Sequence, residues 1–186
     1  MWPLLIGGAV LAGPTIRLLY GEKWLAAATP LSLLLVAQFI VLTFGMNWEL
    51  FVLRDKTAQQ TKYEMTRSIV GLAFFSAGCV FGLGGAAFGR IAESIVGAAL
   101  YLPKMPEMAG TNGRTFLSIY AKSAALTAAA ITPSILLMLA HHWSPETPIT
   151  RVILSVLAGV ALWALVLRYL RHPLFSEIKM FISAVS

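Results

Sequence analysis

The chain has 186 residues, of which 58% are hydrophobic and only 12% are charged. A soluble globular domain is less apolar and carries about twice this share of charge, so the composition excludes that class and predicts a protein that lies in lipid. The net charge of +6 does not indicate a nucleic-acid partner, because the lysines and arginines lie between apolar runs rather than on a basic face interleaved with aromatic residues. The single cysteine excludes an internal disulfide and a cysteine-based metal cluster.

The first part of the chain predicts two membrane-spanning helices. Residues 2–19 are apolar and are interrupted by Gly13 and Pro14, which a span tolerates where neighbours satisfy the freed backbone groups. Residues 25–53 contain Glu49 as their only ionisable side chain. This second run is long enough to cross a hydrocarbon core of roughly 30 Å. A polar connector, residues 54–67, follows it.

Four further spans are predicted in the rest of the chain. They cover about residues 69–83, 86–102, 116–140 and 152–170, and a short cytoplasmic tail, residues 171–186, follows. Gly82–Gly85 predicts a tight turn between the first two of them, and the Pro-, Gly- and Asn-containing stretch 104–114 predicts a loop. Pro133 is expected to kink the fifth span. The predicted fold class is therefore all-α, a polytopic membrane protein with six transmembrane helices in one domain, residues 1–186.

The distribution of positive charge predicts the orientation. Ten lysines and arginines fall on one set of alternate loops and span ends, and four fall on the other. Since short cytoplasmic loops keep the excess of positive charge, both termini are expected in the cytoplasm. Residues 19–24, 82–85 and 141–151 are then expected on the outer side.

Arg90 and Glu93 are the leading candidates for a functional site. Ionisable groups inside a span cost about 2.5–3.5 kcal/mol each on insertion scales, and they often mark a substrate pathway. Three residues apart on a helix, the two side chains share a face and are expected to pair. If the helix begins at Ala86, Arg90 lies roughly 6 Å and Glu93 roughly 10 Å below the outer boundary. Two interpretations stay open: Arg90 binds an anionic group such as a phosphate in a hydrated cavity, or it extends to the surface while Glu93 neutralises it.

Gln38 and Asn47 are weaker candidates for substrate binding. Each lies in the second predicted span, where an amide side chain more often forms a hydrogen bond between helices. His141 and His142 have no carboxylate or cysteine beside them in the sequence, so no metal site is expected. No cofactor motif and no catalytic residue is found, and the chain is not expected to be an enzyme.

Several segments resemble a known transporter family. Leu18-Leu19-Tyr20-Gly21-Glu22-Lys23-Trp24 before a long span, the polar connector after that span, and the glycine-rich turn Gly82-Leu83-Gly84-Gly85-Ala86-Ala87 look like the pattern of bacterial polysaccharide exporters of the Wzx type. These are flippases for lipid-linked oligosaccharides, in the superfamily that also contains the MATE exporters and the murein lipid flippase. Members usually have two lobes of six spans each. The resemblance therefore implies that this chain is a C-terminal lobe, facing a missing N-terminal lobe or a second copy.

The function implied by the resemblance is transport of an undecaprenyl-diphosphate-linked oligosaccharide across the bacterial inner membrane, for surface polysaccharide or lipopolysaccharide synthesis. Arg90 would then contact the charged head group, with Glu93, Gln38 and Asn47 beside it, and membrane lipids would surround the helices. Two alternatives stay open. A cation-coupled, MATE-like exporter would need a deep acidic residue, for which Glu93 is the candidate. A membrane component or enzyme of polysaccharide assembly would need a large loop or an acidic metal motif.

Overall fold

The computed structural model describes residues 1–169, and within this part of the chain the regular structure is helical, without strands. Four of its helical segments are long and apolar enough to cross a membrane, and a bent pair at the N-terminus counts as a fifth if it is one span. The all-α fold is thus confirmed for these residues, and their long apolar helices are compatible with a multi-pass membrane protein. The predicted tail, residues 171–186, lies outside the described residues.

The first predicted span is broken into two helices. α1 covers Trp2–Val10 and α2 covers Ala12–Tyr20, and their axes differ by 74°. Pro14 explains the break, because proline has no backbone N–H and its ring clashes with the carbonyl of residue i−4, here Val10. The two helices together are apolar and long enough for one broken span, so the span predicted over residues 2–19 stays a prediction.

The second predicted span is also interrupted, near its far end. It begins with a 3-10 helix, η1 (Glu22–Ala27), continues as α3 (Ala28–Thr43) and ends as α4 (Asn47–Leu53). At the interruption, the hydroxyl of Tyr120 donates a hydrogen bond to the carbonyl oxygen of Thr43. This bond satisfies an acceptor that the end of α3 leaves without a partner in the helix.

An antiparallel hairpin of two long helices follows. α5 covers Thr57–Cys79 and α6 covers Gly82–Tyr101. Most of the predicted polar connector therefore belongs to α5, since residues 57–67 contain no glycine or proline to stop a helix. The predicted turn lies a few residues too late: the chain reverses at residues 80–81, and Gly82, with φ of +80°, opens α6 in a conformation that favours glycine.

The last helices are close to prediction. The predicted loop 104–114 contains one helical turn, α7 (Met105–Met108). The fifth and sixth predicted spans correspond to α8 (Gly113–Ala140), which continues through Pro133, and α9 (Ile149–Tyr169). Both are among the four candidate spans.

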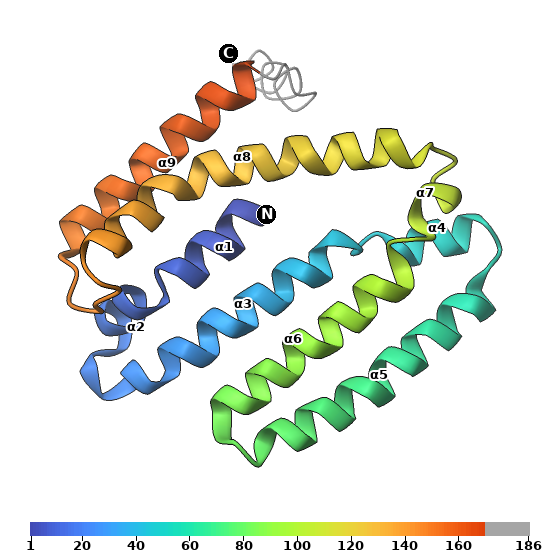
Figure 1. Ribbon diagram of the computed structural model, residues 1–186, viewed down its shortest axis with the longest axis horizontal. Helices are drawn as coiled ribbons and strands as arrows, with labels where there is room; N and C mark the ends of the chain where they lie inside the picture. The colour runs from blue at the N-terminus through green and yellow to red at the C-terminus, as the bar shows by residue number, and fades with distance from the viewer. Residues whose placement is uncertain (170–186) are drawn as a thin grey trace, which may run out of the picture.

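The long helices lie in a row, each beside the next (Figure 1). The neighbours in contact follow the order α9, α8, α1, α3, α6 and α5, so that α6 lies between α3 and α5. Because this arrangement leaves both faces of the row open, many large apolar side chains are exposed, among them Leu72, Phe81 and Leu157. In water such exposure would cause aggregation, whereas in a bilayer these side chains contact lipid.

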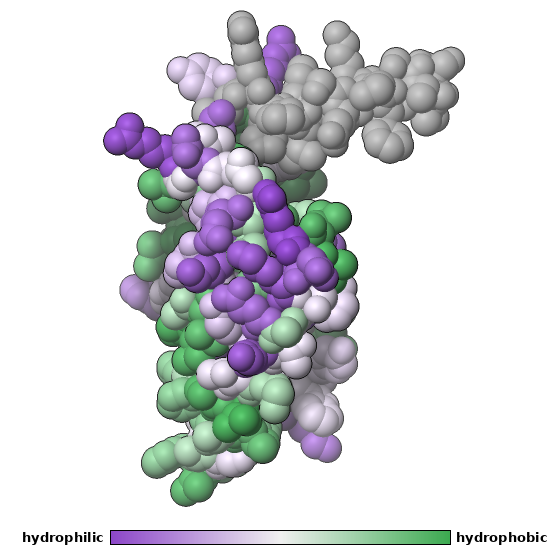
Figure 2. Space-filling view, turned by 90° about the vertical axis from the view of Figure 1, so that its right-hand side faces the viewer, coloured by the Kyte–Doolittle hydropathy of each residue, from purple (hydrophilic) through white to green (hydrophobic). Residues whose placement is uncertain are grey.

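Polar side chains gather at one end of the long helices, where α4, α7 and the start of α5 lie. Figure 2 shows hydrophilic residues around α4, α7 and the start of α5, and a mostly hydrophobic surface below them. Arg54 donates from Nε to the carbonyl oxygen of Met108 at 2.9 Å, and Lys56 pairs with Glu107 at 3.4 Å. Two loops predicted on the same side of the membrane are therefore joined at this end.

The six-span count is not confirmed. α5 is long enough to cross a membrane but is not among the candidate spans within residues 1–169, because its first half carries the polar residues of the predicted connector. Its second half is apolar and exposed, with Ile69 and Phe75 on the surface. α5 as a membrane span stays a prediction.

Candidate functional site

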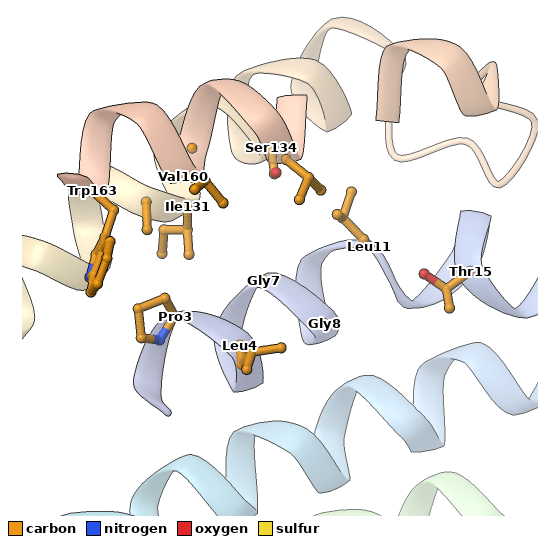
Figure 3. A pocket seen from close by; sticks show the side chains of 13 residues that line it. Pro3, Leu4, Gly7, Gly8, Leu11, Thr15, Ile131, Ser134, Val160 and Trp163 are labelled. Atoms are coloured by element: carbon orange, nitrogen blue, oxygen red, sulfur yellow. The ribbon is translucent and has the colours of Figure 1, made fainter. Parts of the chain in front are cut away.

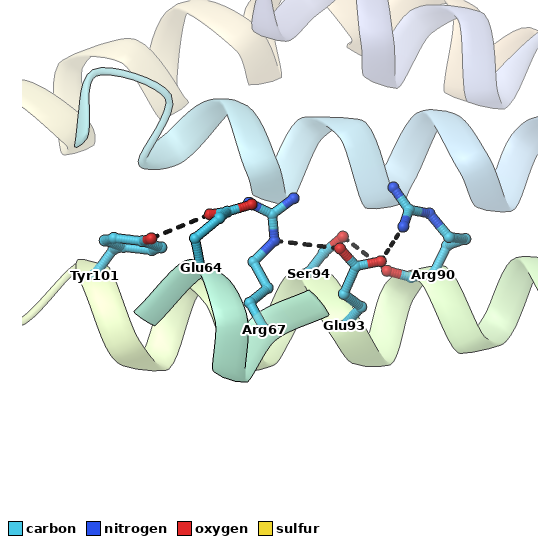
Figure 4. A network of polar contacts seen from close by, with 6 residues as sticks. All are labelled: Glu64, Arg67, Arg90, Glu93, Ser94 and Tyr101. Carbon is cyan, nitrogen blue, oxygen red and sulfur yellow. Dashed lines mark hydrogen bonds and ion pairs between the residues drawn. The ribbon is translucent and has the colours of Figure 1, made fainter. Parts of the chain in front are cut away.

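Four ionised side chains and one tyrosine form a continuous network between α5 and α6 (Figure 4). Glu93 accepts from both neighbouring arginines: Arg67 Nε lies 3.2 Å from its Oε1, and Arg90 Nη1 pairs with its Oε2. Arg67 also pairs with Glu64 at 3.2 Å, and Glu64 accepts a hydrogen bond from the Tyr101 hydroxyl at 3.1 Å. The predicted pairing of Arg90 with Glu93 is confirmed. The four charges sum to zero.

Burial differs strongly along the network. The side chain of Glu93 is 6% exposed and that of Arg67 is 16% exposed, whereas that of Arg90 is 44% exposed. A buried carboxylate is costly unless it is paired and hydrogen-bonded, and here each oxygen of Glu93 has its own cationic partner. Arg90 is therefore the member of the pair that solvent or a ligand can reach.

The site lies deeper in α6 than the sequence indicated. Because α6 begins at Gly82 rather than at Ala86, a rise of 1.5 Å per residue places Arg90 roughly 12 Å and Glu93 roughly 16 Å along the helix. If α6 crosses a hydrocarbon core about 30 Å thick from its first residue to its last, that is close to mid-depth. Arg90 also points toward Glu93, away from the nearer end of the helix (Figure 4). This direction is opposite to the one it would take to reach the outer surface.

Glycines make room for the network. A Cβ atom added at Gly71 would lie 2.7 Å from Cγ of Glu93, and one at Gly97 would lie 2.7 Å from the Phe44 ring and 3.0 Å from Cδ of Arg67. All three distances are shorter than van der Waals contact. The absence of side chains at these two positions lets α5, α6 and α3 approach closely enough for the charged groups to meet.

Arg90 lies in the wall of two hollows, one on each side of α6. The first, about 470 Å³, lies against α5 and is lined by Ser68, Gly71, Leu72, Phe75 and Glu93 in addition to Arg90. The second, about 270 Å³, lies against α3 and includes Gln38 and Ser94. The Ser94 hydroxyl donates to the carbonyl oxygen of Arg90 at 2.8 Å. The structure thus brings three of the four candidate residues, Arg90, Glu93 and Gln38, to one region.

Asn47 lies apart from them. It is the first residue of α4, is 9% exposed, and lines neither of the two hollows that contain Arg90. Its backbone N–H donates to the carbonyl oxygen of Phe44 at 3.1 Å, and Phe44 belongs to a buried cluster with Phe51 and Tyr101. The geometry gives Asn47 a place in helix packing rather than beside Arg90.

The sequence reasoning missed Arg67, Glu64 and Tyr101. Arg67 was assigned to the polar connector as an orientation signal, although it lies within α5. Helical spacing contains the missing signal: Glu64, Arg67 and Gly71 follow the i, i+3, i+7 pattern of one helix face. Had residues 57–67 been read as helix, this face would have been expected to meet the one that carries Arg90 and Glu93.

A third hollow, of about 330 Å³, is apolar (Figure 3). It lies between α1 and the pair α8 and α9, and Leu4, Leu11, Ile131, Val160 and Trp163 are among its lining residues. Thr15 and Ser134 supply hydroxyl groups, and none of its lining residues in the described part of the chain is charged. An anionic head group would find no counter-charge there, so the polar candidate site is the one at Arg90.

No group of three or more His, Cys, Asp or Glu side chains within residues 1–169 is arranged to hold a metal ion. Comparisons with models of protein families, with curated proteins and with solved structures found no match.

Proposed function

We propose that this chain is one lobe of a flippase that moves undecaprenyl-diphosphate-linked oligosaccharide units across the bacterial inner membrane. In this proposal Arg90 binds the diphosphate, and Gln38, across the hollow between α3 and α6, offers an amide to the sugar. The observation that carries the proposal is the exposure of Arg90: a half-exposed arginine side chain near the middle of an apolar helix, with a buried counter-charge. A cation held in this way attracts an anion that must cross the apolar core.

The open arrangement of the helices is consistent with a partner lobe that faces them in this mechanism. Arg90 and the hollows beside it lie at the surface of the row rather than inside a closed bundle. An intramembrane charge needs a water-filled cavity or a protein partner around it. We therefore expect an N-terminal lobe or a second copy to cover this surface and enclose the hydrated path, with both termini of the chain in the cytoplasm.

The geometry favours a flippase over a cation-coupled exporter. An exporter of that kind needs an acidic side chain free to bind a proton or metal cation. Glu93, the candidate, has one arginine on each carboxylate oxygen, so an incoming cation would meet two positive charges. The cation that an anion can reach is Arg90, whose side chain is 44% exposed, against 16% for Arg67.

Arg90→Ala is expected to abolish most of the transport. A hydrogen bond between charged groups contributes about 1.5–3 kcal/mol, which corresponds to a loss of roughly tenfold to a hundredfold. The measurement is the amount of surface polysaccharide, together with the lipid-linked oligosaccharide that accumulates on the inner leaflet, in cells that depend on the complete transporter.

Arg114→Ala is the matched control, because Arg114 is exposed at the start of α8 and lines neither hollow beside Arg90. Its cells are expected to export normally. Normal export from both Arg90→Ala and Arg90→Lys would contradict the assignment of Arg90 to substrate binding.

A further inference from the structure

The two arginines paired with Glu93 differ in the number of contacts that each would lose if it moved away from Glu93. Arg67 is 16% exposed and sits between two carboxylates, those of Glu64 and Glu93. Its guanidinium also lies over the ring of Phe44, with Cζ 5.7 Å from the ring centroid. Arg90 is 44% exposed and, within residues 1–169, forms an ion pair with Glu93 alone. Arg67 is therefore held from several sides and Arg90 from one.

Because each arginine binds a separate oxygen of Glu93, Arg90 can leave Glu93 for an anion while Arg67 stays in place. Arg67 binds Oε1 of Glu93 and Arg90 binds Oε2. If Arg90 turns toward an anion, Oε2 loses its partner while Oε1 keeps the charge-assisted bond to Arg67. The carboxylate then stays ionised, and the cost of an uncompensated buried charge is avoided.

We propose that Arg67 is a positioning residue that lets Arg90 exchange Glu93 for a phosphate or diphosphate group without a change in the protonation of Glu93. This inference rests on the function proposed above and adds the mode by which the anion is bound. Arg67 does not touch the ligand. It keeps Glu93 charged while Arg90 is engaged, so that Arg90 is restored to its resting pair when the anion departs.

The groups around Glu93 define what happens when Arg67 is removed. On α6 the charged neighbour is Arg90, on α5 it is Arg67 with Glu64 behind it, and α3 contains no ionisable residue. Among residues 1–169, Arg67→Gln leaves Arg90 as the one cation paired with Glu93. When an anion takes Arg90, the buried carboxylate of Glu93 is left without a cation and must take up a proton.

The test is isothermal titration calorimetry of the purified chain with inorganic pyrophosphate. Repeating the titration in buffers of different ionisation enthalpy gives the number of protons taken up on binding. Relative to wild type, Arg67→Gln is expected to take up about one additional proton per bound pyrophosphate, and its affinity is expected to fall up to tenfold for each unit of rising pH. Arg67→Lys, which keeps a cation, is expected to add none. The double variant Arg67→Gln/Glu93→Gln is expected to return to the wild-type count, because it lacks the group that is protonated.

An equal proton count in wild type and Arg67→Gln, with pyrophosphate bound by both, would overturn the exchange and leave the proposed function standing. Absence of pyrophosphate binding by wild type would remove the anion site itself, and both proposals with it. Should Arg67→Gln fail to fold, infrared difference spectra of wild type decide: bound pyrophosphate is expected to shift carboxylate bands that Glu93→Gln lacks. A protonated carboxyl band from Glu93 on binding would overturn the exchange.

Discussion

Replacing Glu93 with alanine is expected to lower the free energy of unfolding by about 3 kcal/mol. The substitution leaves Arg67, which is mostly buried, with Glu64 as its one paired carboxylate among the described residues, and it removes the charge between two neighbouring arginines. Removing one partner from a buried pair costs more than the pair contributes, because the remaining charge stays out of water. Denaturation of the purified protein in detergent, followed by circular dichroism, gives the value.

Glu22→Ala serves as the control for this loss. Glu22 forms an ion pair with Arg17 at 2.7 Å, but its side chain is 71% exposed, and exposed pairs contribute about 0–1 kcal/mol. A Glu93→Ala protein as stable as Glu22→Ala would mean that the network between α5 and α6 is not formed in the folded protein.

Gly78→Ala is expected to cost a similar amount, at about 3 kcal/mol, through packing rather than charge. A Cβ atom at residue 78 would lie 2.3 Å from the carbonyl oxygen of Gly85 and 3.0 Å from Cα of Ala86. Both are backbone atoms, so the clash can be relieved only by moving α5 away from α6. The same denaturation measurement applies, and activity is expected to fall with stability, because the charged network bridges these two helices.

Gly84→Ala is the matched control, since it adds the same methyl group in the first turn of α6 where no heavy atom lies within 4 Å. It is expected to be neutral or slightly stabilising, because alanine favours helix more than glycine does. Equal stability of Gly78→Ala and Gly84→Ala would contradict the close approach of the two helices.

The sequence predicted best where apolar runs are long and end at clear loops. α8 begins three residues before the predicted span 116–140 and ends where predicted, and α9 begins three residues before the predicted span 152–170. The breaks within the first two spans were harder to foresee. Pro14 was noted but was treated as tolerable, whereas the chain bends by 74° at that point. An apolar run shows that a segment lies in lipid, but composition alone does not show whether its helix is continuous.

The site was predictable only within one helix. The spacing of Arg90 and Glu93 gives their pairing, because helix geometry is local. Arg67 comes from another helix, 26 residues earlier. Its contact with Glu93 depends on the register of the hairpin, which the turn at residues 80–81 and the glycine contacts set together. The helix over residues 57–67 was not predicted, because this polar segment lacks the apolar periodicity from which a helix is recognised.

Labelling of cysteines from one side of the membrane tests whether these helices cross a bilayer with the basic end, around α4 and α7, in the cytoplasm. Single cysteines in a Cys79→Ser background, at Lys56 and Lys104 for the basic end and at Lys23 and His142 for the opposite end, are treated with a membrane-impermeant maleimide. The account predicts that positions 23 and 142 react in intact cells, and that positions 56 and 104 react only after the membrane is opened. Reaction of positions 56 and 104 in intact cells, or equal reaction at all four positions, would contradict it.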